Sequence, residues 1–361
     1  MLIKGNPSLP AGIRNLLLIQ LGDIGDVVLT TPAIQALREA FPSARIHAAV
    51  REKARGILEC CPPVDDISYV KKEGHSLFEA FRTQRRFFRR LRRPPLDLSI
   101  DLRTGTRGAI MALLSGAPTR IGRYSETDTL WRNRVFTHLV APRDEATQYC
   151  AEHGLNILRP FGIATQERRP KLVAPPTLHD RAASILASAG LPRGRPFIAV
   201  QPFSLWEYKE WPAECFARLI SLMSTEFERP VVLIGTRSER ERAAGLAAKA
   251  RGDIFHLAGM TTLDELAGVL SLATMLIGCD SAGIHIAAAV GTPTVSIFGP
   301  SSPISWAPRG PRHHVVCQHW DCVPCRQKGC QNSEVSRCLQ TLPVEAVLET
   351  VRLAFTDRSG Q

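Results

Sequence analysis

Apolar and polar residues alternate along this chain in blocks whose lengths suit strands and helices in turn. An apolar run at 16–20 enters a glycine-containing loop, and residues 27–41 then carry apolar positions at helical spacing before Pro42. Strand, glycine loop and helix form the opening unit of a doubly wound fold. Further strands are predicted at 45–50, 67–70 and 96–101, with helix-like segments between them. The first half is therefore predicted to hold a parallel sheet.

The same alternation begins again after a polar, proline-containing stretch at 166–176, which has the character of a linker. Helices are predicted at 178–189, 213–227, 238–250, 263–270 and 282–290. Strands are predicted at 197–201, 230–234, 254–257, 275–277 and 294–298. We therefore expect an α/β protein with two Rossmann-like domains, at 1–170 and 177–342. Helical spacing after Pro343 predicts that residues 343–361 end in a helix that docks on the folded body, with the N-terminal domain as one surface for it.

Composition agrees with a folded enzyme and places it in the cytosol. The chain has 361 residues, of which 44% are apolar and 22% are charged, and it contains no low-complexity tract. No run approaches the roughly 20 apolar residues of a membrane span, and residues 1–14 lack the features of a signal peptide. Half of the ten cysteines are dispersed in a long chain without an export signal, so we expect reduced thiols.

The charge of the chain indicates an anionic partner. The formal net charge is +11, which suits nucleic acid, a membrane surface or an acidic small molecule. Net charge does not distinguish among these three partners.

The loop Gly22–Asp26 is the first candidate for chemistry. Its glycines stand three apart and an aspartate follows the second, so it is not the G-x-G-x-x-G fingerprint of dinucleotide binding. A nicotinamide-dependent dehydrogenase is therefore disfavoured. The loop could be a tight turn capped by Asp26. Its place beyond the carboxyl end of a strand, where open α/β sheets bind ligands, favours a functional site.

Two further loops follow strands in the second half. Residues 277–285 pass from an apolar strand through Asp280 and small residues into a helix, whose free N–H groups can hold a phosphate. The alternative is a capped helix with a half-buried His285. Ser204 and Lys209 follow the strand 197–201, and a lysine there can neutralise a phosphate or can simply be solvated.

Five stretches, in order along nearly the whole chain, carry a family resemblance. They are 25–32, 209–212 (Lys-Glu-Trp-Pro), 257–263, 280–287 and 298–303. Together they resemble glycosyltransferase family 9, the ADP-heptose:lipopolysaccharide heptosyltransferases. The chain departs from the family's Asp-(Ser/Thr)-Gly-Pro-Met-His motif by carrying Ala282 and Gly283 at the Gly-Pro positions.

The resemblance implies a fold and an activity. The fold is GT-B, with two Rossmann-like domains facing a central cleft, the acceptor bound by the N-terminal domain and the nucleotide sugar by the C-terminal domain. The activity is inverting transfer of heptose from ADP-L-glycero-β-D-manno-heptose to the inner core of lipopolysaccharide, with Kdo2-lipid A or a heptosylated form as acceptor. An alternative is a family member that uses another nucleotide-sugar donor or a protein acceptor.

The resemblance also implies roles for individual residues. Asp26 matches the proposed base, and Lys209 matches a contact to the diphosphate, so catalysis needs no cofactor. Asp280 would orient the heptose hydroxyls, Glu239 resembles the acid that binds the ribose, and the main chain near Met260 would meet the adenine. The full set of expected donor-binding residues is Ser204, Glu239, Met260, Thr261, Asp280, Ser281, Ala282, Gly283 and His285.

An arginine-rich stretch at 78–93 is interleaved with phenylalanine and leucine. As a helix it would place an apolar stripe beside a cationic face, which is typical of an element at a membrane surface. The alternative is a helix packed on the core with a solvated arginine face. We expect contact with the acceptor or with the anionic inner membrane, and no nucleic-acid binding because no motif supports it. The residues concerned are Arg82, Arg85, Arg86, Arg89 and Arg90.

Five cysteines fall within residues 317–338, with a C-x-x-C core. That density of thiols would allow a structural zinc or iron site, and some relatives carry iron there. The candidate ligands are Cys322, Cys325, Cys330 and Cys338. Reduced cysteines without a metal are the preferred interpretation. A basic metal-thiol module that binds nucleic acid is a further alternative, which the ordered motifs in both halves disfavour.

Overall fold

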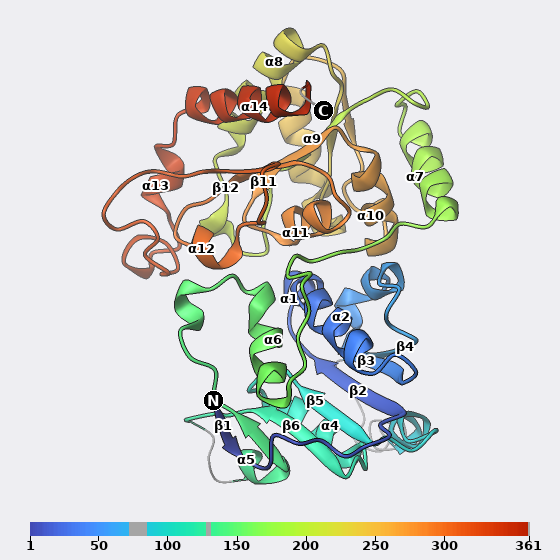
Figure 1. Ribbon diagram of the computed structural model, residues 1–361. Coiled ribbons are helices and arrows are strands. Elements are labelled where there is room, and N and C mark those ends of the chain that lie inside the picture. The colour runs from blue at the N-terminus through green and yellow to red at the C-terminus, as the bar shows by residue number, and fades with distance from the viewer. Residues whose placement is uncertain (72–84, 128–130, 360–361) are drawn as a thin grey trace. The chain divides into compact units, whose positions relative to one another are not determined.

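The computed structural model describes residues 1–71, 85–127 and 131–359, and it forms two compact units, Met1–Pro170 and Lys171–Gln361. Each unit is built around one sheet with helices packed against it (Figure 1). The boundary between the units falls within the polar stretch 166–176.

The N-terminal unit contains a seven-stranded sheet in the order β1-β7-β6-β5-β2-β3-β4. Its edge strand β1 pairs antiparallel with β7, and the other neighbouring strands are parallel. The strands are β1 (Leu2–Lys4), β2 (Asn15–Gln20), β3 (Arg45–Arg51), β4 (Asp66–Val70), β5 (Leu98–Asp101), β6 (Thr119–Arg123) and β7 (His138–Val140).

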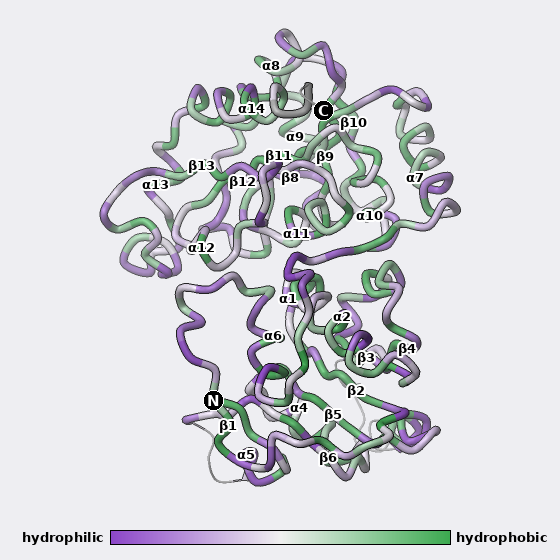
Figure 2. The backbone as a smooth tube through the Cα atoms, in the orientation of Figure 1, coloured by the Kyte–Doolittle hydropathy of each residue, from purple (hydrophilic) through white to green (hydrophobic). Residues whose placement is uncertain are grey.

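Helices pack against this sheet because its central strand β2 is apolar on both faces, as its hydropathy shows (Figure 2). Leu17 and Ile19 share one core cluster with Ala109 and Met111 of α4. Residues 16 and 18 point to the opposite face because side chains alternate along a strand. The helices are α1 (Ile24–Leu29), α2 (Thr31–Ala40), α4 (Thr106–Leu114), α5 (Arg132–Val135) and α6 (Ala151–Leu158), and residues 85–91 are also helical.

The first helix differs from the sequence prediction. Instead of one helix over 27–41 there are two, α1 and α2, which meet at Thr30. Pro32 lies in the first turn of α2, where proline is tolerated because the N–H groups of that turn have no partner within the helix. The break leaves α1 as a short helix directly after the Gly22–Asp26 loop.

The C-terminal unit contains a six-stranded, all-parallel sheet in the order β10-β9-β8-β11-β12-β13. The strands are β8 (Ile198–Gln201), β9 (Val231–Leu233), β10 (Ile254–His256), β11 (Met275–Cys279), β12 (Thr294–Ile297) and β13 (His313–Val316). The helices are α7 (Pro176–Ser188), α8 (Ala213–Phe227), α9 (Arg240–Lys249), α10 (Leu263–Leu272), α11 (Ala282–Ala289), α12 (Pro303–Trp306), α13 (Arg337–Gln340) and α14 (Val344–Ser359).

The last helix packs on the C-terminal unit. Val347, Leu348 and Val351 of α14 are buried in the same core cluster as Phe216 and Ile220 of α8. Phe355 stacks on Phe227, with ring centroids 4.2 Å apart. Burial of each such side chain contributes roughly 1.5–3 kcal/mol, so apolar packing holds α14 on its own unit.

Candidate functional site

The Gly22–Asp26 loop connects β2 to α1 and is closed by a capping box. Asp23 is the N-cap of α1, and its backbone N–H donates to Asp26 Oδ2 at 2.8 Å. Asp26 is the third residue of the helix, so its carboxylate takes part in capping without being the N-cap itself. The capping role and the functional role considered for this loop therefore involve the same side chain.

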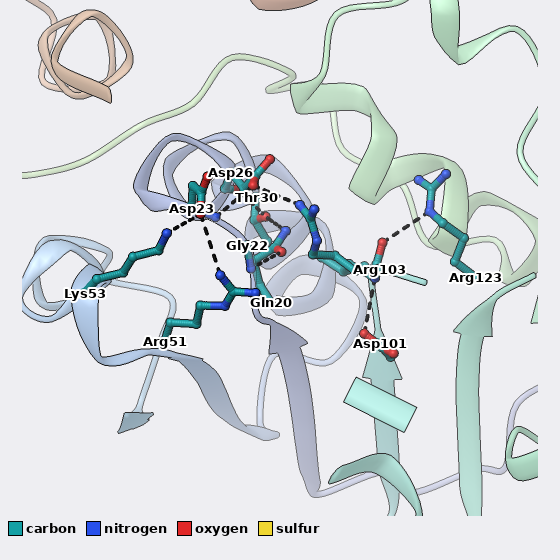
Figure 3. A network of polar contacts seen from close by, with 11 residues as sticks. Gln20, Gly22, Asp23, Asp26, Thr30, Arg51, Lys53, Asp101, Arg103 and Arg123 are labelled. Carbon is teal, nitrogen blue, oxygen red and sulfur yellow. Dashed lines mark hydrogen bonds and ion pairs between the residues drawn. The ribbon is translucent and has the colours of Figure 1, made fainter. Parts of the chain in front are cut away.

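Asp26 also forms an ion pair with an arginine that follows the neighbouring strand, β5. Arg103 Nη1 donates to Asp26 Oδ2 at 2.8 Å (Figure 3). Among the described residues, Asp26 Oδ1 has no hydrogen-bond partner, and the side chain is 22% exposed. A Cβ atom on Gly22 would lie 2.4 Å from Asp26 Oδ2, so glycine is required there. One oxygen is thus fixed and the other is open to accept a proton.

Two more cations border the loop. Lys53 Nζ donates to Asp23 Oδ1, and Arg51 Nη1 lies 3.8 Å from the same oxygen (Figure 3). Arg51, Lys53 and Arg103 are each more than two-fifths exposed. Three cations therefore surround two carboxylates, Asp23 and Asp26, which leaves this edge of the sheet with excess positive charge.

Behind Arg103 lies a buried ion pair. Asp101 ends β5 and is 1% exposed, whereas Arg132 begins α5 and is fully buried; Arg132 Nη2 lies 3.4 Å from Asp101 Oδ2. Burial raises the pKa of Asp101 to about 7, and the N–H of Arg103 and the charges of Arg132 and Arg103 oppose that rise. Gly108 of α4 packs on this carboxylate, because a Cβ there would lie 2.5 Å from Asp101 Oδ2.

In the C-terminal unit, Lys209 and Asp280 form an ion pair in a position that corresponds to that of Asp26 and Arg103. Lys209 Nζ donates to Asp280 Oδ2 at 2.7 Å, and Asp280 is only 5% exposed. Ser204 Oγ donates to the backbone oxygen of Asp280 at 3.3 Å. The chain brings these three predicted residues together although more than 70 positions separate Asp280 from the other two.

The loop that carries Lys209 is anchored to the core on its far side. Trp211 is buried, its backbone N–H donates to Cys279 Sγ at 3.3 Å, and its Nε1 donates to Leu342 O at 3.0 Å. Glu210 Oε1 accepts the Ser204 N–H at 2.9 Å. The Lys-Glu-Trp-Pro stretch therefore positions the loop as well as supplying a lysine.

The ion pairs Asp26–Arg103 and Lys209–Asp280 both lie where the order of strands in their sheet reverses. From β2 the N-terminal sheet runs through β3 to β4 on one side and through β5 to β7 on the other, and Asp26 follows β2 while Arg103 follows β5. In the second sheet Lys209 follows β8 and Asp280 follows β11, which are again the two strands at the switch. Ligands of open α/β sheets bind at such points.

The start of α11 is shaped by glycine. Ser281 is its N-cap, and Gln201 Nε2 donates to Ser281 Oγ at 3.2 Å. A Cβ on Gly283 would lie 1.9 Å from Gln201 Oε1. Ala282, the first residue of the helix, is partly exposed beside it. The chain thus keeps a glycine within the first turn, one position later than the family motif has it.

Glu239, Met260 and Thr261 lie in loops that follow β9 and β10, at the same carboxyl edge. Glu239 Oε2 accepts the Thr236 N–H at 2.6 Å, and Met260 is 40% exposed. Gly259 has φ +71°, and a Cβ there would lie 2.6 Å from Arg237 Cα, so the two loops approach closely.

His285 is buried, as Asp280 and Ser204 also are. It is 4% exposed on the second turn of α11, with its ring centroid 6.4 Å from that of Trp306. The alternative interpretation of the sequence has this histidine half-buried, and the structure buries it fully.

The arginine-rich helix packs on the core by its apolar side. Leu91 belongs to the cluster that contains Leu17 and Ile19, and Phe87 and Phe88 pack against it, so these three side chains face the core; the remainder of the predicted stripe lies outside the described residues. Arg82 lies outside the described residues. The other arginines line an open hollow of about 490 Å³, and the lining residues are Arg85, Arg86, Arg89, Arg90 and Arg93.

This arginine hollow lies at the amino edge of the N-terminal sheet. Arg90 and Arg93 also line an adjoining cavity of about 170 Å³ with Asn15, Arg45 and Asp66, the first residues of β2, β3 and β4. Asp26 and Arg103 follow the opposite, carboxyl ends of their strands. In the described ranges no helix is long and apolar enough to span a bilayer.

The cysteine-rich segment does not form a ligand set in the described chain. Within residues 1–71, 85–127 and 131–359, no three His, Cys, Asp or Glu side chains are grouped so as to hold a metal ion. Cys338 is buried, which raises the pKa of its thiol to about 11, with smaller contributions from Cys330, Cys325 and Cys322. The zinc or iron site that the spacing suggested therefore stays a prediction.

Sequence reasoning did not identify Arg51, Lys53, Asp101, Arg103 and Arg132. Asp101 was predicted to end a strand, and Asp101-Leu102-Arg103 thus carried the same signal as Gly22–Asp26: polar residues directly after an apolar run. The pairing of Arg103 with Asp26 depends on β5 lying beside β2, which the order of elements along the chain does not state.

Comparisons with known proteins agree with these observations. The family model "Glycosyltransferase family 9 (heptosyltransferase)" matches residues 84–336. Lipopolysaccharide heptosyltransferase 3 of Escherichia coli is 28% identical over 290 residues, 79% of this chain and 83% of that protein. Lipopolysaccharide heptosyltransferase 1 of Pseudomonas aeruginosa is 27% identical over 352 residues, covering 93% and 94%.

A solved structure extends the likeness to the fold. That of E. coli ADP-heptose lps heptosyltransferase II superimposes with a TM-score of 0.79 at 21% identity, covering 96% of this chain and 99% of that one. The predicted α/β class with two Rossmann-like domains, the GT-B fold, is confirmed.

Proposed function

Because the chain belongs to glycosyltransferase family 9, we propose that this enzyme transfers a heptose from ADP-heptose to the inner core of lipopolysaccharide, with inversion at the anomeric carbon. Family membership establishes a glycosyltransferase and confirms the resemblance that the sequence motifs indicated. The curated relatives are named for heptose transfer to lipopolysaccharide or lipooligosaccharide. The E. coli enzyme whose structure superimposes on this chain is named for ADP-heptose.

The observation that carries the proposal is the state of the Asp26 carboxylate. Arg103 and the Asp23 N–H occupy one oxygen and keep the carboxylate oriented, while Oδ1 has no partner in the described chain. A group held in this way suits a general base that takes a proton from an acceptor hydroxyl. We therefore assign acceptor binding to the N-terminal unit.

The donor half of the proposal rests on Lys209 and the start of α11. Lys209 is paired with Asp280, and the diphosphate of a nucleotide sugar would compete for its ammonium group. The first N–H groups of α11 lack partners within the helix and suit an anion. Asp280 is then left to orient sugar hydroxyls, and Glu239, Met260 and Thr261 lie in loops suited to a nucleoside.

The chemical step is a single displacement. Asp26 Oδ1 takes the proton of the acceptor hydroxyl as that oxygen forms a bond to the anomeric carbon of the heptose. The bond from the anomeric carbon to the β-phosphate oxygen breaks, and its electron pair leaves with ADP. Lys209 and the α11 amides stabilise the negative charge that develops on the diphosphate. No metal ion is needed for this step.

The charge around Asp26 suits an acidic acceptor. Arg51 and Lys53 are exposed beside the proposed base, and each can pair with a carboxylate or phosphate group. An inner core built from acidic sugars and phosphorylated lipid presents both kinds of group.

We assign the arginine hollow to an anionic membrane surface rather than to the acceptor's reacting end, because it lies at the edge of the sheet opposite Asp26. The enzyme would then act in the cytoplasm, attached peripherally to the inner membrane. Arg85→Glu together with Arg89→Glu should abolish sedimentation with vesicles that contain phosphatidylglycerol, whereas Arg193→Glu together with Arg195→Glu should retain it. Equal vesicle binding by both variants would show that the arginine hollow is not the membrane-binding surface.

One experiment tests the donor and the acceptor together. The purified protein is incubated with ADP-heptose and Kdo2-lipid A, with or without one heptose already attached, and ADP release is measured. ADP should raise the melting temperature more than UDP does. Stabilisation by UDP alone would indicate that the donor is another nucleotide sugar. ADP release only in the presence of a protein acceptor would show that a protein, and not lipopolysaccharide, is the acceptor.

A further inference from the structure

The buried Asp101–Arg132 pair surrounds the backbone of a single exposed residue, Arg103. Asp101 Oδ1 accepts the Arg103 N–H at 3.2 Å, and Arg132 Nη2 donates to Arg103 O at 2.6 Å. Arg123 Nε donates to Leu102 O at 3.2 Å, on the same peptide group as the Arg103 N–H. Side chains therefore fix both peptide groups that flank Arg103.

Further contacts in the interior hold the Arg132 guanidinium in place. Its Nη1 donates to Arg123 O at 2.7 Å, and its guanidinium lies 5.0 Å from the ring centre of Phe136. Asp101 is covered on its other side by Gly108 of α4. Neither Asp101 nor Arg132 is exposed enough to meet a substrate.

A buried ion pair is a costly way to stabilise a core. Removing two charges from water usually costs about as much as their attraction returns, and apolar residues of similar volume often stabilise a core better. A contribution to stability therefore does not explain this pair, and its role is better explained by the residue that it positions. What it positions is Arg103, whose side chain donates to Asp26 Oδ2.

We propose that Asp101 and Arg132 are positioning residues for the reaction: they clamp the backbone of Arg103 so that its guanidinium holds one oxygen of Asp26 and leaves the other for the acceptor hydroxyl. This inference rests on the proposed function of Asp26 as the base. Loss of the clamp lets Arg103 leave Asp26, so the carboxylate loses its orientation while both binding sites remain.

The test compares Arg132→Lys and Asp101→Asn with a matched control, Arg120→Lys. Arg120 is a half-buried arginine of the same unit that donates to the backbone oxygens of Val135 and Ala117 at 2.8 and 2.7 Å. It contacts neither Arg103 nor Asp101 through any hydrogen bond in the described chain. A general effect of losing an arginine–carbonyl contact will therefore appear in the control as well.

Hydrogen exchange gives a readout that does not depend on activity. The Arg103 amide should exchange at least about tenfold faster in Arg132→Lys and in Asp101→Asn, and its rate should be unchanged in Arg120→Lys. An unchanged exchange rate of the Arg103 amide in all three variants would show that Asp101 and Arg132 do not clamp the Arg103 backbone. Because this measurement needs neither donor nor acceptor, it separates failure of the clamp from failure of the proposed function.

Kinetics supply the second readout. Misplacement of a catalytic group by about 1 Å can cost on the order of 100-fold, so kcat should fall about 10- to 100-fold in Arg132→Lys with both KM values within about twofold of the unaltered enzyme. In an Arg103→Ala background, Arg132→Lys should reduce kcat no further, because both changes release the same carboxylate. Additive losses would show that Arg132 has only a structural role.

Discussion

At the scale of single residues, the site combines a fixed carboxylate with the charges that hold it. Asp26, Lys209 and Asp280 could be predicted as candidates because each follows an apolar strand. Their partners could be predicted only in part. The sequence motifs grouped Lys209 with Asp280, but no local pattern joins Asp26 to Arg103 or Asp101 to Arg132, since those contacts depend on which strands are neighbours.

The raised pKa of Asp101 predicts how stability depends on pH. The folded protein binds this proton up to a pH of about 7, whereas an unfolded aspartate releases it near 3.8. Between these values the folded state binds more protons, so the free energy of unfolding falls as pH rises, by up to about 4 kcal/mol for this group. Asp101→Asn removes this dependence.

Urea unfolding at intervals from pH 4 to pH 7.5 measures the effect. The stability of Asp101→Asn relative to the unaltered protein should increase steadily across that window and level off above it. A constant difference would mean that Asp101 ionises in the folded protein as it does in the unfolded chain.

At the scale of elements, glycine positions decide how closely loops approach the ligands. Gly283 lies in the first turn of α11, and an added methyl group would displace Gln201 from Ser281. The resemblance pointed to this turn, but the sequence could not show which neighbour fills the space over Gly283. That neighbour is the last residue of β8, which is adjacent to β11 in the sheet.

Gly283→Ala should therefore weaken donor binding by about tenfold, because Gln201 would be pushed into the space beside the proposed diphosphate site. Gly245→Ala is the control, since Gly245 also lies in a helix and has open space around it. Binding of ADP is measured by calorimetry in both variants. Equal affinity in the two would show that Gln201 moves without affecting the donor.

At the scale of the whole molecule, the sequence predicted two α/β units because their core strands are short apolar runs between amphipathic helices. Strands that carry polar or basic residues were not identified, such as β6 (Thr119–Arg123) and β13 (His313–Val316). They join the sheets by backbone pairing, which makes no demand on side-chain pattern. The strand order, and with it the two switch points, likewise depends on tertiary packing.

The central claim is that Asp26 removes a proton from the acceptor in the N-terminal unit, whereas the C-terminal unit binds the donor. Asp26→Asn preserves the shape of the side chain and most of its hydrogen-bonding geometry but removes its basicity. The most direct test measures heptose transfer and ADP affinity on the same preparation of this variant. The account predicts a kcat lower by about 100- to 10,000-fold with an unchanged Kd for ADP. Transfer within about tenfold of the unaltered enzyme would contradict it.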